Sequence, residues 1–164
     1  MVRWLRGEQT VIYLIDRGRL ESFEARDLTA LADAQIRRAT LRLNATAVSA
    51  LEKGDVDGCY AAAYDAYRMA AEALLARQGL RATGGDGSHM SVEDAVSAQF
   101  AAKIPAFAKP IFERLRRTRH TAQYFDPSAA PITKPDAEWA IQKATEGLAG
   151  TKTVLSATPP ERFG

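Results

Sequence analysis

The residues best suited to chemistry are concentrated between Phe112 and Asp126, where the chain reads FERLRRTRHTAQYFD. Four arginines stand within six residues, at positions 114, 116, 117 and 119, and His120 and Tyr124 follow them. A guanidinium group can donate two parallel hydrogen bonds to a phosphate, and an imidazole can transfer protons near neutral pH. These residue types at this spacing point to contact with RNA or a nucleotide.

The same segment has the pattern of an amphipathic helix. At about 100° per residue, the stripe predicted to be buried consists of Ile111, Leu115, Thr118, Ala122 and Phe125. The opposite face carries Arg116, Arg117, His120 and Tyr124, while Arg114 and Arg119 lie on the two flanks. An arginine-rich face is often only a solvated surface, but like charges on adjacent turns repel each other by roughly 0.2–0.5 kcal/mol per pair. A bound anion would relieve this repulsion, so Arg114, Arg116 and Arg117 are candidate phosphate-binding residues.

The elements that position this segment are predicted to be helices. The chain has 31 alanines and few β-branched runs, and apolar residues recur every three or four positions from Asp27 to Leu51. Turn residues at positions 53–58 separate this helix from a second one, which Asp55 or Asp57 can cap and which runs to Gln78. The second helix is apolar on almost all sides, which is typical of the central helix of a bundle.

The rest of the chain is predicted to complete an antiparallel bundle. The segment Gln9–Leu20 could be a short helix or a strand, and a helix is favoured. The other expected elements are a flexible connector over Arg81–His89, a helix from Ser91 with a capping box to Lys103, a helix from Pro110 that stops before Pro127, and a last helix from Thr133 toward Leu155. The predicted fold class is all-α, with about five helices. Residues 1–25 are expected to pack on a bundle formed by residues 26–157, with a flexible tail at residues 158–164.

Composition limits the classes of function. The 164 residues suit one domain, and a net charge of +2 argues against a protein that coats nucleic acid nonspecifically. The single Cys59, the lack of a leader pattern and the lack of a long apolar run favour a cytoplasmic protein that does not span a membrane. Two histidines and one cysteine, far apart in sequence, argue against a protein-built zinc site, and no metal or other cofactor is expected.

Other polar and aromatic residues have competing interpretations. The glycine-rich Gly84–Gly87 segment lacks the Gly-Lys-Ser/Thr of a phosphate-binding loop, and His89 beside it is expected to be solvent-exposed, although it could approach the arginine-rich helix. The three tyrosines of the central helix are expected to pack in the core rather than stack on bases. Asp65 and Arg68 either support the arginine-rich helix or form a solvated pair.

Most of the chain resembles the HEPN domains, small helical bundles often encoded beside nucleotidyltransferases in toxin–antitoxin and defence systems. The resemblance rests on the second helix from Tyr64 to Leu75, on Gln78–Thr83 and on the arginine-rich helix ending Arg119–Tyr124. The family signature is an arginine, a polar residue, and a histidine four to six positions after the arginine. In many members this motif cleaves RNA without a metal at a dimer interface, so the resemblance implies a homodimer.

The resemblance places Arg119 at the motif arginine and His120 at the polar position, and Tyr124 stands where catalytic members carry histidine. The phenol of a free tyrosine has a pKa of about 10 and is a poor general base at neutral pH. Two other pairings satisfy or approach the motif, since His120 follows Arg114 at the family spacing and follows Arg116 by one helical turn. The candidate catalytic residues are therefore Arg119, His120 and Tyr124.

Three hypotheses remain open. The chain is an RNA- or nucleotide-binding protein that cleaves RNA in a toxin–antitoxin or defence setting, with an antitoxin or nucleotidyltransferase as partner. Alternatively, it is an inactive HEPN-like protein that binds a nucleotide or a nucleotidyltransferase. In the third hypothesis it is a dimeric interaction bundle whose arginines only hold an acidic partner.

Overall fold

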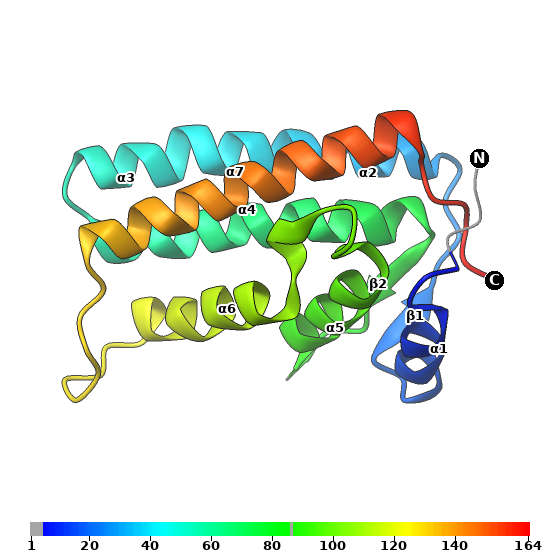
Figure 1. Cartoon of the computed structure of the whole chain (residues 1–164), viewed down its shortest axis with the longest axis horizontal. Coiled ribbons are helices and arrows are strands. Elements are labelled where there is room, and N and C mark those ends of the chain that lie inside the picture. Colours follow the sequence, from blue (N-terminus) through cyan, green and yellow to red (C-terminus); the bar gives the residue numbers. More distant parts are fainter. Residues whose placement is uncertain (1–4, 86) are drawn as a thin grey trace.

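Helices make up most of the chain, and the predicted all-α fold is confirmed (Figure 1). The computed structural model describes residues 5–85 and 87–164, so residues 1–4 of the expected N-terminal segment and residue 86 of the expected connector lie outside the described part. Its elements in chain order are α1 (Glu8–Asp16), β1 (Leu20–Ser22), α2 (Leu28–Leu41), the π-helical η1 (Arg42–Ala47), α3 (Val48–Glu52), α4 (Val56–Arg77), β2 (Leu80–Ala82), α5 (Ser88–Phe100), the 3₁₀ turn η2 (Pro105–Phe107), α6 (Lys109–Gln123) and α7 (Lys134–Ala157).

Helix α4 is the centre of the bundle. Figure 1 shows it between α2, α3 and α7 on one side and α5 and α6 on the other, and it contacts all five. Its alanines let these neighbours approach closely, and its large side chains fill the space between them. Tyr60, Tyr64 and Tyr67 are each no more than 1% exposed, which confirms that the three tyrosines belong to the core.

The predicted helix starts are largely confirmed by their capping contacts. Asp27 accepts a hydrogen bond from the Ala30 amide at the start of α2, and Asp55 accepts one from the Gly58 amide at the start of α4. At the start of α7, the Thr133 hydroxyl accepts from the Asp136 amide and the Asp136 carboxylate accepts from the Thr133 amide. Each contact satisfies an amide that a helix N-terminus otherwise leaves unpaired.

Two predicted segments differ from the structure. The helix expected to reach Leu20 ends at Asp16, and β1 instead pairs antiparallel with β2, with Leu20 opposite Ala82. A left-handed Gly18 makes this change of direction possible. Helix α5 begins at Ser88, after a left-handed Gly87, and Ser91 is wrong as its cap because the Ser91 hydroxyl donates to the Gly87 carbonyl inside the first turn.

The arginine-rich helix α6 is rotated relative to the predicted stripe. Phe112 and Leu115 are both fully buried, whereas Phe125 lies beyond the end of α6 and is 92% exposed. If angles around the helix axis are measured from the direction of Ile111, Phe112 lies at about 100° and Leu115 at about 40°. The buried face is therefore centred near the direction of Arg119 at about 80°, and Arg119 points into the bundle instead of along its flank.

The last residues of the chain lie at the same end of the bundle as α1 and β1 (Figure 1). Residues 158–164, expected to be a flexible tail, form hydrogen bonds from the Phe163 amide to the Gln78 carbonyl and from the Arg162 guanidinium to the Phe23 carbonyl. At the N-terminal end, α1 contacts α5. Within the described residues, none of the helices combines the length and apolar character needed to cross a membrane.

Tyr67 should measurably stabilise the connection that leads into α6. Its buried hydroxyl donates to the Ala106 carbonyl at 2.7 Å, and Tyr67→Phe would leave that carbonyl unpaired. We expect this substitution to lower the free energy of unfolding by about 1–3 kcal/mol in urea titrations. Tyr13→Phe, which removes the hydroxyl of an exposed tyrosine in α1, is the control and should change it by less than about 0.5 kcal/mol. Equal effects of the two substitutions would contradict a stabilising role of the Tyr67 hydroxyl.

Candidate functional site

A cleft of about 680 Å³ lies between the start of α5 and the second half of α6. The side chains that line it and can do chemistry are His89, Arg116, Arg117, Arg119, His120 and Tyr124. Five of these six were predicted from the sequence, and all five come from the segment that contains α6 and the residue after it. The five predicted residues therefore form one wall of the cleft, and His89 of α5 lies on the opposite wall.

Arg116 is held in the cleft by a buried carboxylate. Its Nε atom donates to the Glu93 carboxylate of α5 at 2.7 Å, and the side chains of Arg116 and Glu93 are 21% and 2% exposed. A carboxylate this deeply buried is costly without a cation beside it. Glu93 was not predicted from the sequence, because the spacing of the α5 residues does not reveal that α6 places an arginine beside it.

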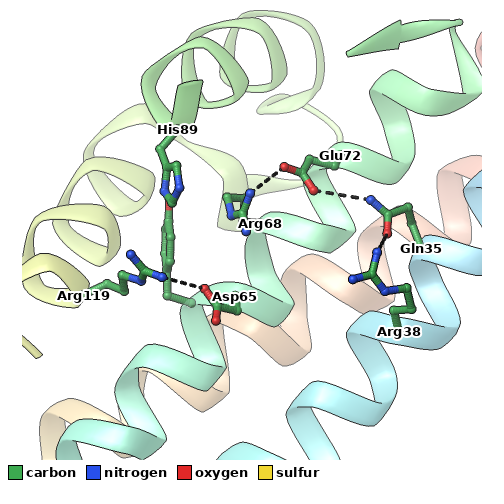
Figure 2. A network of polar contacts seen from close by, with 8 residues as sticks. Gln35, Arg38, Asp65, Arg68, Glu72, His89 and Arg119 are labelled. Carbon is green, nitrogen blue, oxygen red and sulfur yellow. Dashed lines mark hydrogen bonds and ion pairs between the residues drawn. The ribbon is translucent and has the colours of Figure 1, made fainter. Parts of the chain in front are cut away.

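Arg119 is held by α4. Its Nη2 atom lies 3.4 Å from the Asp65 carboxylate (Figure 2). Its guanidinium lies 5.9 Å from the centre of the Tyr64 ring. Asp65 therefore contacts the arginine-rich helix, which agrees with the interpretation that Asp65 supports this helix. The Nε atom of Arg119 is buried and has no hydrogen-bond partner among the described residues.

Arg68 takes part in a separate polar chain that runs away from α6. It pairs with Glu72 at 2.8 Å, Glu72 accepts a hydrogen bond from Gln35, and Gln35 accepts one from Arg38 (Figure 2). Burial raises the pKa of Glu72, although the Arg68 guanidinium opposes this shift. Through Glu72, this chain joins α4 to α2, and in the described part of the protein Arg68 forms no hydrogen bond or ion pair with α6.

The other two arginines differ in their surroundings. Arg114 stacks over Trp139 of α7, with 4.0 Å between the guanidinium carbon and the ring centre, and lies 3.9 Å from the Asp136 carboxylate. The structure does not bring Arg114 to the cleft. Arg117 pairs with Glu113 one turn earlier on α6 and is 72% exposed, so it remains accessible to a ligand at the cleft edge.

His89 was predicted to be a solvent-exposed loop residue, and this prediction is wrong. It lies in the first turn of α5, its Nδ1 atom is 3.0 Å from the Tyr64 hydroxyl, and the two rings stack with centres 5.7 Å apart. Burial and the nearby guanidinium groups of Arg68, Arg119 and Arg116 lower its pKa to about 4, against the opposing effect of Asp65. His89 is therefore neutral at physiological pH.

His120 and Tyr124 lie together at the exposed end of α6. Their ring centres are 4.8 Å apart, and the Tyr124 amide donates to the His120 carbonyl as the helix ends. Both side chains are exposed, and Tyr124 is 57% exposed. The imidazole and the phenol can thus reach the same bound group, with the guanidinium groups of Arg116 and Arg119 deeper in the cleft.

Comparison with known protein families agrees with this architecture. The family model of the HEPN domain matches residues 32–149. The chain belongs to the HEPN family. The matched region of this HEPN protein begins inside α2, ends inside α7 and includes every residue of the cleft, whereas α1 and β1 lie outside it. No curated protein and no solved structure gives a significant match to the chain.

The buried ion pair in the cleft of the HEPN domain should dominate the response to arginine substitutions. Arg116→Ala leaves the Glu93 carboxylate buried without its cation, and we expect a loss of about 3–5 kcal/mol in the free energy of unfolding. Arg117→Ala, on the exposed surface of the same helix, should cost less than about 0.5 kcal/mol.

Urea unfolding measures both effects of this pair of substitutions. The double substitution Glu93→Gln and Arg116→Gln removes the two charges together and should recover most of the lost stability. A loss in the double variant as large as in Arg116→Ala would contradict the ion-pair explanation.

The pH dependence of stability should report the environment of His89. Its pKa falls from about 6.5 in the unfolded chain to about 4 in the folded protein, so the unfolded state binds more protons between these values. The free energy of unfolding should therefore fall as the pH is lowered through this window and be constant above it.

His89→Gln should remove this part of the acid destabilisation, which we expect to be about 1–3 kcal/mol after allowance for the partial exposure of the ring to solvent. The measurement is the difference in unfolding free energy between about pH 7 and about pH 4 for both proteins. Met90→Gln, at the exposed neighbouring position in α5, is the control and should retain the full pH dependence. The same slope in wild type and His89→Gln would show that His89 is not protected from protonation.

Proposed function

We propose that this HEPN protein binds single-stranded RNA in the cleft between α5 and α6 and cleaves it without a metal ion. The observation that carries the proposal is that Arg116, Arg119 and His120 line one cleft, so two cations and a proton-transfer group face the same space. Guanidinium groups recognise phosphate oxygens by paired hydrogen bonds, and the imidazole supplies acid–base chemistry. Arg117 extends the cationic surface to the cleft edge.

In the proposed reaction, the ribose 2′-oxygen attacks its own phosphorus and the bond to the 5′-oxygen of the next nucleotide breaks. The 2′-hydroxyl loses its proton and the leaving 5′-oxygen gains one, so the products are a 2′,3′-cyclic phosphate and a 5′-hydroxyl. His120 takes part in this proton transfer. Arg119, whose guanidinium also contacts Asp65, stabilises the negative charge that develops on the phosphoryl oxygens.

A second copy of the chain completes the site in this proposal. His120 and Tyr124 are exposed at the mouth of the cleft, so a partner subunit can contact them and the bound RNA together. The family resemblance favours such a homodimer and a role as a toxin or defence protein in the cytoplasm, with an antitoxin or nucleotidyltransferase as partner.

A catalytically inactive role is the second candidate, and two observations favour it. Tyr124 occupies the position of the family histidine, and both inner arginines already have carboxylate partners in Glu93 and Asp65. In this alternative the cleft retains a nucleotide or a nucleotidyltransferase without cleaving RNA. An interaction bundle that holds an acidic partner is the third candidate and needs no phosphate in the cleft.

Cleavage of RNA in the presence of a chelator tests the first candidate. Purified protein should convert single-stranded RNA to fragments with 2′,3′-cyclic phosphate ends, and His120→Gln should slow this by about 10²–10⁴-fold. Arg37→Gln, a charge change on the exposed surface of α2, is the control and should leave the rate unchanged. Full activity of the His120→Gln protein would overturn the assignment of His120.

Binding of a 2′-deoxy strand, which lacks the attacking hydroxyl, separates the remaining candidates. Arg119→Gln should weaken this binding by at least about tenfold under the first two candidates, because it removes a phosphate contact. Strong binding with no RNA cleavage would favour the inactive candidate. Undetectable binding by the wild-type protein would leave the interaction bundle.

A further inference from the structure

The cleft contains a second imidazole that the arginine-rich helix does not supply. We propose that His89 is a catalytic residue of the RNA cleavage described above: its Nε2 atom accepts the proton of the ribose 2′-hydroxyl, while His120 gives a proton to the leaving 5′-oxygen. This assignment rests on the proposed function. It gives the chain a base on α5 and an acid on α6, on two walls of one cleft.

The structure holds the His89 ring in a defined orientation. Nδ1 lies 3.0 Å from the hydroxyl of Tyr64, a side chain with no exposed surface, and the two rings are within 16° of parallel. Burial raises the pKa of Tyr64 above its ordinary value, so its hydroxyl stays protonated, and either the hydroxyl or Nδ1–H can donate in this contact. The proposal requires the tautomer with the proton on Nδ1, which donates to the Tyr64 oxygen and leaves the lone pair of Nε2 free for a substrate.

The charged groups around His89 keep the free imidazole neutral. Arg68 and Asp65 face it from α4, and Arg116 and Arg119 face it from α6. Three cations against one carboxylate disfavour a further positive charge, in addition to the effect of burial. A phosphodiester bound to Arg119 adds a negative charge to this group and makes His89 more basic at the moment when a base is needed.

The proposed step balances with no additional reactant. The bond from the 2′-oxygen to phosphorus forms as the bond from phosphorus to the 5′-oxygen breaks. Nε2 of His89 gains one proton and His120 loses one, and water returns both histidines to their starting states after the products leave. Tyr64 is a positioning residue, since it orients the ring and does not contact the reacting atoms.

An RNA strand with sulfur in place of one bridging 5′-oxygen distinguishes the two histidines. A thiolate leaves without a proton, so loss of the acid no longer matters on this substrate, whereas loss of the base still does. His120→Gln should lose at least about 100-fold on normal RNA but cleave the sulfur-linked strand within about tenfold of wild type. His89→Gln should lose at least about 100-fold on both substrates.

Two further measurements separate catalysis from folding. His89→Gln should bind the 2′-deoxy strand within about threefold of wild type, which shows an intact cleft, since the base acts on a hydroxyl that this strand lacks. Tyr64→Phe keeps the imidazole and removes its orienting hydroxyl, and it should slow the cleavage of both substrates by about tenfold. If His89→Gln does not fold, Tyr64→Phe decides the question by the same comparison.

The outcomes are distinguishable from failure of the proposed function. Wild-type protein that cleaves neither substrate overturns the ribonuclease proposal, and the assignment of His89 with it. If the wild-type protein cleaves both substrates, two results for His89→Gln overturn only the role of His89 as the base. One is a cleavage rate equal to that of the wild type, and the other is a rate that the sulfur-linked substrate restores. Wild-type rates in Tyr64→Phe would overturn its role in orienting the ring.

Discussion

The rotation of α6 about its axis is set by the pairing of Arg116 with Glu93 together with the burial of Phe112 and Leu115, and the site depends on that rotation. Glu93 is almost completely buried on α5, so its negative charge needs a cation at one particular place. In the structure, one rotation of α6 brings Arg116 there and also places Phe112 and Leu115 in the core. The same rotation directs Arg119 toward Asp65 and puts His120 at the mouth of the cleft. Apolar packing and one ion pair thus favour the same orientation of the whole helix.

The arginines of the cleft combine a structural and a proposed functional role. Arg116 and Arg119 neutralise carboxylates when no ligand is bound, and a phosphate would compete with or share these contacts. This arrangement removes much of the like-charge repulsion that first suggested an anionic ligand. It therefore weakens the electrostatic argument for binding, while the pre-oriented guanidinium groups strengthen the geometric one. A deeply buried Glu93 gives up its partner at a higher cost than the partly exposed Asp65, so Arg119 is the better candidate for phosphate contact.

The sequence was sufficient to predict the helices but not the orientation of every helix. Asp27, Asp55 and Thr133 mark helix starts through local hydrogen bonds, and local patterns reveal such contacts. The rotation of α6 depends on Glu93, twenty-three positions before Arg116, and no local pattern contains that information. His89 was misplaced for a related reason. A capping pattern at Ser91 suggested a later start for α5, whereas Gly87 in the left-handed region starts it one turn earlier and carries the imidazole to Tyr64.

The π-helical stretch η1 has a consequence for the long helix that precedes α4. The buried residues Ala39, Leu43 and Ala47 follow one another at intervals of four, and each such interval advances the direction around a regular α-helix by about 40°. Continued without correction, this advance would carry α3 progressively off the face that meets α4. The wider turn of η1 takes up the excess, so that the two halves of the helix share one contact line. The π-helical stretch thus keeps the buried faces of α2 and α3 aligned. A one-residue deletion within it would rotate all of α3 about the helix axis by about a quarter of a turn.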